Sequence, residues 1–282
     1  PPLSKDEWID YFNLYKTIPE YKEQNFNMSL YEFKIIFWWE WSHRQLGRLI
    51  GLLALLPLIY FTVKNEYKIL KEYSLIFLLI CFQGFIGWYM VTSGLVNRVD
   101  VSHYRLSLHL VIAFIILSLV FLKFLKLQKI RIIQTSIKLN SLRFFLFLIF
   151  LQLIMGAFVS GMDAGKIYNT WPLMGSSYFP DDSMLGEFFN LNLFDNPSIV
   201  QFIHRNLAYV IVFMYFYILY SVFKDGNLEL RFPILIIGLS LLLQIILGIL
   251  TILSGVKMLY ASLHQINSIL IILSTLYFLH IT

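Results

Sequence analysis

Long apolar runs separated by shorter polar stretches set the pattern of this chain. Each run holds about 17 to 25 mostly apolar residues, which is enough for an α-helix to cross the hydrocarbon core of a bilayer. The strands of a membrane β-barrel would alternate apolar and polar residues, and these runs do not. The pattern predicts seven membrane helices, at 43–63, 73–95, 104–122, 143–162, 200–223, 232–255 and 258–280.

Composition agrees with this pattern. The chain has 282 residues, of which 58% are hydrophobic and only 14% charged, a balance that excludes an ordinary soluble globular domain. Its one cysteine, Cys81, lies inside a predicted helix, so an intrachain disulfide is excluded and a cysteine metal site is not expected. The chain begins Pro-Pro-Leu-Ser without a methionine or a signal-like apolar stretch, and we expect it to be a fragment. The predicted fold class is an all-α polytopic membrane protein.

The basic residues fall mainly on one side of the predicted membrane. Eleven Lys and Arg lie in one set of connecting loops and four in the other. Since an excess of Lys and Arg marks the cytoplasmic or matrix side, the first set is predicted to face inside, and it needs no nucleic acid as a partner. The inner set comprises 64–72, 123–143 and 224–231, and the outer set comprises 97–105, 163–199 and 256–259.

The first 42 residues form an outer-side segment that leads into the first span. The stretch from Ser4 to Trp8 predicts a short capped helix that begins near Ser4. Residues 29–42 are predicted to form a second helix, and their aromatic side chains are typical of an interfacial belt.

An internal repeat organises the rest of the chain. Residues of the same type recur at an offset of 161 or 155. The segments 43–122 and 200–280 are therefore predicted to be the same three-helix unit written twice and related by a pseudo-twofold axis along the membrane normal. The matching pairs are His43 and His204, Arg44 and Arg205, Gln83 and Gln244, Gly87 and Gly248, and Ser93-Gly94 and Ser254-Gly255 at 161, and His109 and His264 at 155.

The helix 143–162 opens the second unit and has no counterpart in the first. It carries a third Gln-x3-Gly motif, at Gln152 and Gly156, and we interpret these motifs as helix packing. By the repeat, the complete protein is expected to have one more helix before residue 1, and the first half is expected to show an open groove in its place. The predicted domains are the outer segment 1–42, the three-helix repeat 43–122, the basic inner loop 123–142, and the four-helix repeat 143–280 with its outer loop 163–199.

Four histidines lie at one depth, near the outer ends of predicted helices. Imidazole is a good ligand for haem iron, and two imidazoles on neighbouring helices of a four-helix bundle can hold a haem between them. A single membrane histidine is more often a buried polar contact or a proton relay, but four in two repeat-related pairs favour iron ligands. The pairs are His43 with His109 and His204 with His264, and the arginines that could bind haem propionates are Arg44, Arg48, Arg105 and Arg205.

The two halves differ three residues before the first histidine of each pair. The first half has Glu40 there and the second has Gln201, and only a carboxylate can take up a proton and carry charge. One interpretation is an ordinary interfacial glutamate paired with a nearby arginine. Set beside the repeat, the difference favours a reactive first half with Glu40 as its catalytic group, and an electron-handling or structural second half. Gln201→Glu is then expected to leave the reaction largely intact.

Short motifs are spread along essentially the whole chain. They include Glu40-Trp-Ser-His43-Arg44, Gln83-Gly-Phe-Ile-Gly87, Val101-Ser-His-Tyr104-Arg105 with His109-Leu110, Gly161-Met-Asp163-Ala-Gly165 with Asn169-Thr-Trp171-Pro172, Gln201 to Arg205, and His264-Gln265. Together they resemble the haem A synthase family, in the longer, mitochondrial-type branch that bacteria share. Each piece alone is weak, but the joint pattern is very specific.

The resemblance implies that the protein oxidises the C8 methyl of haem O to a formyl group with oxygen from water, and so makes haem A for cytochrome oxidase. It implies two pseudo-symmetric four-helix bundles, of which the first here lacks its first helix. It also implies that His43 and His109 hold the substrate haem, and that Glu40 is the functional glutamate. His204 and His264 would hold a b-type haem. The outer-loop cysteine pair of one bacterial branch is absent, so a redox-active disulfide is not expected.

The implied partners are haem O supplied by a haem O synthase, an unidentified electron carrier and membrane lipid, and a homo-oligomer is left open. The implied location is the bacterial plasma membrane, with the haem sites near the outer face, or the mitochondrial inner membrane. Two other classes stay open. One is a bis-histidine cytochrome that only transfers electrons, which would need no Glu40. The other is a repeat-built transporter, although the short broken helices typical of that class are not evident here.

Overall fold

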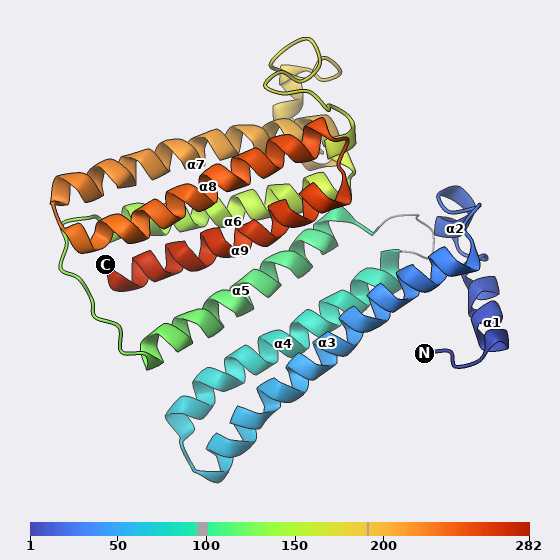
Figure 1. The fold of residues 1–282 in the computed structure, drawn as a ribbon, viewed down its shortest axis with the longest axis horizontal. Helices are drawn as coiled ribbons and strands as arrows, with labels where there is room; N and C mark the ends of the chain where they lie inside the picture. Colours follow the sequence, from blue (N-terminus) through green and yellow to red (C-terminus); the bar gives the residue numbers. More distant parts are fainter. Residues whose placement is uncertain (95–100, 191) are drawn as a thin grey trace. The chain divides into compact units, whose positions relative to one another are not determined.

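Helices account for nearly all of the regular structure. The computed structural model describes residues 1–94, 101–190 and 192–282, and within these ranges the only strand-like pairing is an isolated bridge between Met174 and Ser177. Seven described helices are long and apolar enough to cross a membrane (Figure 1), which confirms the prediction of an all-α polytopic membrane protein. They are α3 (Leu30–Val63), α4 (Tyr67–Gly94), α5 (His103–Leu127), α6 (Leu139–Gly161), α7 (Pro197–Asp225), α8 (Arg231–Leu253) and α9 (Met258–Ile281). The short helices are α1 (Lys5–Tyr15), α2 (Pro19–Glu23), η1 (Ala164–Lys166), η2 (Leu185–Phe189), η3 (Leu193–Asp195) and η4 (Leu228–Leu230).

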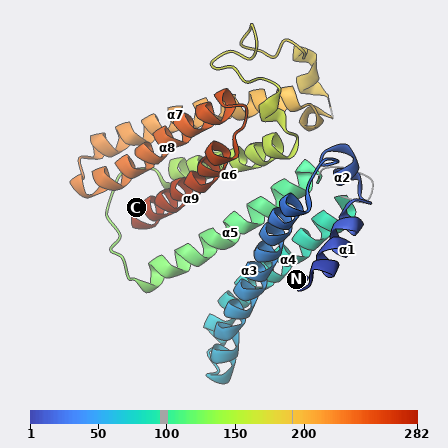
Figure 2. The same cartoon turned by 45° about the vertical axis from the view of Figure 1, so that its right-hand side comes forward.

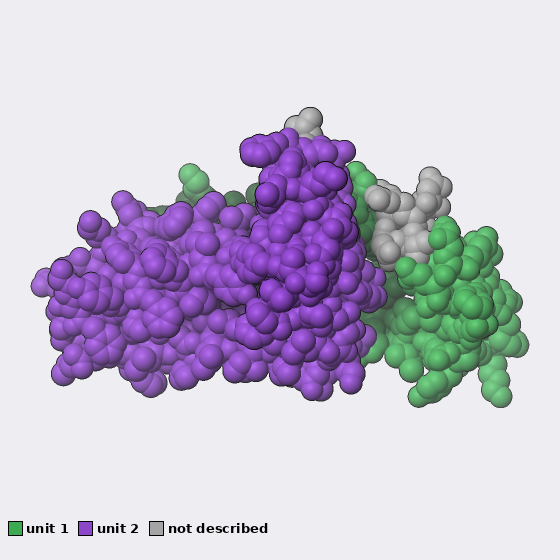
Figure 3. All heavy atoms as spheres, turned by 90° about the horizontal axis from the view of Figure 1, so that it is seen from above, with its two compact units in different colours: residues 1–112 green, residues 113–282 purple. Residues whose placement is uncertain are grey.

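The chain divides into two compact units, Pro1–Ile112 and Ala113–Thr282, which Figure 3 shows in different colours. The boundary falls inside α5, so this helix contributes to both units. The first unit therefore holds α1 to α4 and the first turns of α5, and the second holds the rest of α5 and α6 to α9.

The helix predicted near Ser4 is present in the first unit as α1. The Ser4 hydroxyl accepts a hydrogen bond from the backbone N–H of Glu7, and the Glu7 carboxylate accepts one from the backbone of Ser4. This capping box satisfies donors that the first turn would otherwise leave unpaired. Trp8 and Phe12 then pack against Phe33, which fixes α1 on the start of α3.

The first membrane helix is longer than its apolar run. α3 begins at Leu30, where Ser29 and Glu32 form a second capping box. Since no glycine or proline interrupts residues 30–46, nothing ends the helix at residue 42, and the predicted lead-in helix and first span are one element. α3 and α4 then lie side by side as an antiparallel pair (Figures 1 and 2).

In the second unit α6 to α9 form a four-helix bundle, with α6 beside α7 and α8 beside α9 (Figures 1 and 2). α7 and α8 approach closely because Tyr215 lies against Gly238, where any side chain would collide with the tyrosine hydroxyl. The same hydroxyl donates a hydrogen bond to the carbonyl of Ile234 at 3.3 Å. A buried polar group is thus satisfied at the helix contact.

Candidate functional site

The structure brings the four candidate histidines together in the two predicted pairs. In the first unit, the ring centroids of His43 on α3 and His109 on α5 lie 6.4 Å apart, with 67° between the ring planes. In the second unit, those of His204 on α7 and His264 on α9 lie 6.5 Å apart, at 71°. The two pairs have nearly the same geometry, in agreement with the repeat.

This spacing fits one metal ion between two imidazoles. With metal–nitrogen bonds of about 2 Å, and about 1 Å from each nitrogen to its ring centre, two rings on one ion stand about 6 Å apart. Over the described residues, no group of three or more His, Cys, Asp or Glu side chains could hold a bare ion. A metal bound by one of these pairs would bring most of its own donors, as the iron of haem does with its porphyrin.

A glycine on a neighbouring helix makes room for three of the four rings. A Cβ atom built on Gly87 would lie 2.9 Å from Cε1 of His109, so a side chain there would displace the ring. The other two contacts are Gly156 with His204 at 3.2 Å and Gly248 with His264 at 3.0 Å. His43 is exposed, and none of the glycines whose surroundings the structure describes lies against it.

The glutamine four residues before each of these glycines contacts the same histidine. In two cases its amide donates to the backbone carbonyl of the histidine, and in two its amide nitrogen lies beside the imidazole. The contacts are Gln83 Nε2 to His109 O at 2.9 Å, Gln152 Nε2 to His204 O at 3.0 Å and to His204 Nε2 at 3.4 Å, and Gln244 Nε2 to His264 Nε2 at 3.3 Å. The Gln-x3-Gly motifs, which the sequence led us to interpret as helix packing, therefore also seat the histidines.

Glu40 lies on α3 one turn before His43. Its Oε2 is 3.1 Å from NH1 of Arg44, and the two side chains are 59% and 49% exposed. An exposed pair of this kind contributes roughly 0–1 kcal/mol to stability. The pairing with a nearby arginine that the sequence left open is thus present, and the Glu40 carboxylate remains accessible to water.

The corresponding residues of the second half bind a loop instead. Gln201 Nε2 and Arg205 NH2 both donate to the carbonyl oxygen of Tyr168 at 3.1 Å. Arg205 NH1 also donates to the carbonyl of Leu173 at 3.3 Å. Gln201 is only 1% exposed and Arg205 only 8%. These bonds tie the outer loop 163–199 to α7.

The four candidate propionate-binding arginines are held in different ways. Arg44 and Arg205 make the contacts given above, and the Arg105 guanidinium lies over the ring of Tyr89, 4.8 Å from its centroid. Arg48 is exposed and donates to a neighbouring side chain of its own helix. Arg205 is the only buried member of the four, its Nε has no hydrogen-bond partner, and no carboxylate among the described residues pairs with it.

Two carboxylates order the outer loop from within. Asp181 accepts from the hydroxyl of Ser177 at 2.6 Å and from the backbone of Ser176 at 3.1 Å, and these bonds hold its pKa below the usual value. Asp182 accepts from the hydroxyl of Ser198 at 2.7 Å. Burial acts to raise the pKa of Asp182, but the hydrogen bond from Ser198 and those from its other neighbours outweigh burial, so this pKa is also lowered.

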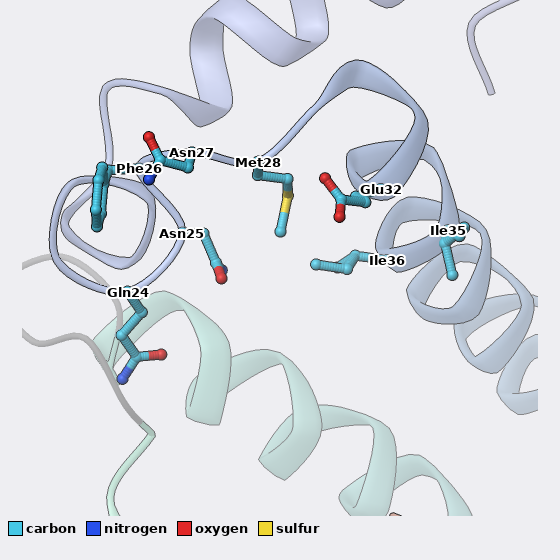
Figure 4. Close-up of a pocket in the computed structure, with 8 residues that line it drawn as sticks. All are labelled: Gln24, Asn25, Phe26, Asn27, Met28, Glu32, Ile35 and Ile36. Carbon is cyan, nitrogen blue, oxygen red and sulfur yellow. The ribbon is translucent and has the colours of Figure 1, made fainter.

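A surface hollow in the first unit is formed by the turn after α2 and the first turns of α3 (Figure 4). Its ionisable lining residue, Glu32, is bound to Ser29 in the capping box of α3. The carboxylate of Glu32 is thus engaged in capping α3. Its lining residues are Gln24, Asn25, Phe26, Asn27, Met28, Glu32, Ile35 and Ile36.

Comparison with known proteins covers nearly the whole chain. A family model described as "Cytochrome oxidase assembly protein" matches residues 1–276. This chain belongs to that family. A relative named heme A synthase from Pelagibacter ubique is 48% identical over 281 residues, which is 99% of this chain and 82% of the relative. Relatives of the same name from Rickettsia bellii and Wolbachia pipientis are each 41% identical, over 96% and 99% of this chain and 83% and 80% of their own lengths. These matches confirm the resemblance to the haem A synthase family.

In this chain the sequence indicated the histidines but not the residues that hold them. One signal was available, because the Gln and Gly of each motif lie four apart and so share a helix face, and Gln83 and Gly87 recur at 161, the offset of His43 and His204. Another residue gave no signal. The buried Asn267 donates to the side-chain oxygen of Gln244 at 2.7 Å, and the repeat places Ile112 at the matching position of the first half.

Proposed function

We propose that this protein is a haem A synthase, an oxidoreductase that converts the C8 methyl group of haem O to a formyl group. The observation that carries the proposal is the pair of bis-imidazole sites, which recur at the same spacing in a chain whose relatives are named heme A synthase. Haem A made here would serve cytochrome oxidase, in keeping with the description of the family as assembly proteins.

His43 and His109 hold the substrate haem in this proposal, and His204 and His264 hold a resident haem b. The exposure of His43 supports the first assignment, because a substrate must enter and a product must leave. The second assignment is supported by Gly156 and Gly248, which lie against the rings of His204 and His264. A resident haem supplies one-electron transfer between the substrate and an acceptor.

The conversion proceeds as two successive two-electron oxidations. Water supplies the oxygen of the formyl group, protons leave to the outer water, and electrons leave to an electron carrier. The Glu40 carboxylate stabilises the positive charge that develops on the oxidised carbon and takes a proton from the attacking water. Its place one turn before His43 puts it on the same helix face as that ligand, and Arg44 orients it through their 3.1 Å ion pair.

Arginines bind the propionates of both haems. Arg205 serves the resident haem, and Arg44, Arg48 and Arg105 serve the substrate. The surroundings of Arg205 support the first assignment, because burying a cation that, among the described residues, donates only to the carbonyl oxygens of Leu173 and Tyr168 is costly until a carboxylate balances its charge.

The protein is a multi-pass membrane protein, and we place it in the bacterial plasma membrane. The excess of Lys and Arg in the loops 64–72, 123–143 and 224–231 puts those loops inside, and hence both histidine pairs near the outer face. Haem O would be supplied by a haem O synthase, and the oxidation requires an electron carrier as acceptor.

Expression of the full-length protein in a host that makes haem O but no haem A tests the proposal. Extracted pigment is expected to contain haem A, and the purified protein is expected to show a low-spin haem spectrum. His109→Ala should abolish haem A and keep the haem of the second pair. Bound low-spin haem without any haem A would overturn the proposal in favour of a cytochrome that only transfers electrons. If the protein binds no haem at all, the result would favour a transporter.

A further inference from the structure

Two consecutive loop residues connect the helices that surround the second histidine pair. The carbonyl of Tyr168 accepts hydrogen bonds from Gln201 and Arg205 on α7, and the histidine of α7 lies between these two in the sequence. The side-chain amide of the next residue, Asn169, donates to the carbonyl of Ile252 in the last turn of α8 at 3.1 Å. One short stretch of the outer loop therefore binds α7 on one side and α8 on the other.

The contact on α8 lies close to the other histidine of the pair. Ile252 is four residues, about one turn, after Gly248, and a Cβ built on Gly248 would lie 3.0 Å from Cε1 of His264. The Asn169 amide also donates to the carbonyl of Gly165 at 2.8 Å, so one side chain ties η1 to the end of α8. Both of its contacts are to carbonyl oxygens, so a side chain without an N–H cannot replace it.

The helix η1 also packs against the turn between α8 and α9. In this turn Val256 has a φ of 61°, a left-handed conformation that β-branched residues rarely adopt. A Cβ built on Gly165 would lie 3.0 Å from Cγ2 of Val256, so an added methyl group would force the two apart by a few tenths of an ångström. Val256 cannot easily turn aside, because a β-branched side chain is stiff at χ1 and its backbone N–H donates to Thr251 at 2.8 Å. This close contact fixes the start of α9 against the loop.

A haem iron tolerates little change in the spacing of its two ligands. The ring centroids of His204 and His264 lie 6.5 Å apart, close to the distance of about 6 Å that one shared metal ion requires. Metal–ligand distances vary by only about ±0.2 Å around their usual values. A shift of a few tenths of an ångström between α7 and the start of α9 would therefore strain the bonds to iron.

We propose that residues 164–169 form a clamp that holds α7 and the α8–α9 turn at the spacing required by the haem of the second pair, with Gly165 and Asn169 as its positioning residues. The inference rests on the proposed function, because it takes the second pair to hold a haem. The bonds of the clamp lie on the helices and not on the ring nitrogens of His204 and His264, so binding of iron leaves them in place.

Haem binding by the second pair tests the clamp in the full-length protein with His109→Ala, which removes a ligand of the first pair. Gly165→Ala is expected to weaken haem binding about 10-fold, which corresponds to about 1.4 kcal/mol. It should also shift the electron paramagnetic resonance of the low-spin ferric haem, which depends on the orientation of the two imidazoles. Adding Val256→Ala removes the methyl group that the new atom would strike and should restore both values. Gly186→Ala is the matched control, since no atom lies within 4 Å of a Cβ at this position of the same loop.

Asn169→Asp is the second variant, and it decides alone if Gly165→Ala fails to fold. Its carboxylate would face two carbonyl oxygens without a donor, so haem binding should weaken and the resonance should shift in this variant too. Thr170→Val is its control, because the hydroxyl of Thr170 bonds only to Leu173 and Gly175 among the described residues, both within the loop. This control should leave haem affinity and the resonance unchanged.

Parent-like affinity and resonance in Gly165→Ala and Asn169→Asp would overturn the clamp and leave the proposed function intact. So would an equal effect of Thr170→Val, because the haem would then respond to any disorder of the loop. Lower thermal stability of the haem-free variants with an unchanged resonance would show a purely structural role and would also overturn the clamp. If the His109→Ala parent binds no haem, the proposed function fails instead.

Discussion

Arg205 donates a hydrogen bond to the carbonyl oxygen of Tyr168 at 3.1 Å and thereby ties the outer loop 163–199 to α7. Its repeat partner, Arg44, instead makes an ion pair with Glu40 on an exposed face of α3, also at 3.1 Å. The same His-Arg pattern thus anchors a loop in the second half and leaves a carboxylate open to water in the first.

Gln201→Glu is expected to loosen the outer loop. The sequence alone predicts that this change leaves the reaction largely intact, but Gln201 is 1% exposed and donates to the Tyr168 carbonyl. An ionised carboxylate cannot donate and would face that carbonyl, at a cost of about 1–3 kcal/mol. Limited proteolysis of the loop and thermal unfolding measure the effect. Gln201→Leu, which removes the bond without adding a charge, should show a smaller loss. A loop as resistant to protease as the parent would contradict the prediction.

Gly87→Ala is expected to weaken haem binding by the first pair. The added methyl group would lie 2.9 Å from Cε1 of His109 and would turn the ring away from its partner. Gly84→Ala is the matched control, since no atom lies within 4 Å of a Cβ at this position of the same helix. The control should bind haem normally and gain up to about 1 kcal/mol in helix propensity. Absorbance titration with haem compares the two, and equal affinities would show that the ring is not seated by Gly87.

The sequence contained enough to predict the helices and the histidine pairs. The length of an apolar run and the offset of a repeat can both be counted along the chain. The contacts that hold the imidazole rings depend on which residues of neighbouring helices meet. The spacing of residues along one helix does not predict these contacts between helices. Tyr168 shows the limit most clearly, since a loop carbonyl accepts hydrogen bonds from Gln201 and Arg205 and has no side-chain signature. The merging of residues 29–42 with the first span was missed because the change in composition there does not interrupt the helix.

The outer loop is expected to lose order in acid. The pKa values of Asp181 and Asp182 are lowered in the folded protein by hydrogen bonds to loop residues. Their contribution is therefore fully present above the ordinary aspartate pKa of about 3.9 and is lost as the pH falls through the lowered folded values. Hydrogen exchange of the loop between neutral pH and about pH 3 follows the transition. Asp181→Asn should already weaken the loop at neutral pH and reduce its further loss in acid. An unchanged acid response in Asp181→Asn would count against this assignment.

Glu40→Gln is expected to keep haem binding and lose roughly 10²–10⁴ in rate, the usual scale for a positioned acid–base group. The exposed pair with Arg44 contributes only about 0–1 kcal/mol, so a large loss of rate cannot come from unfolding. The amide keeps the shape of the side chain but can neither take up a proton nor stabilise a cation. The measurement is the ratio of haem A to haem O in extracted pigment, with bound haem checked by its spectrum. Glu66→Gln, just beyond the other end of α3, is the control and should leave the ratio unchanged. If Glu40→Gln makes haem A at the parent rate, Glu40 is an interfacial charge and the proton must be taken by another group.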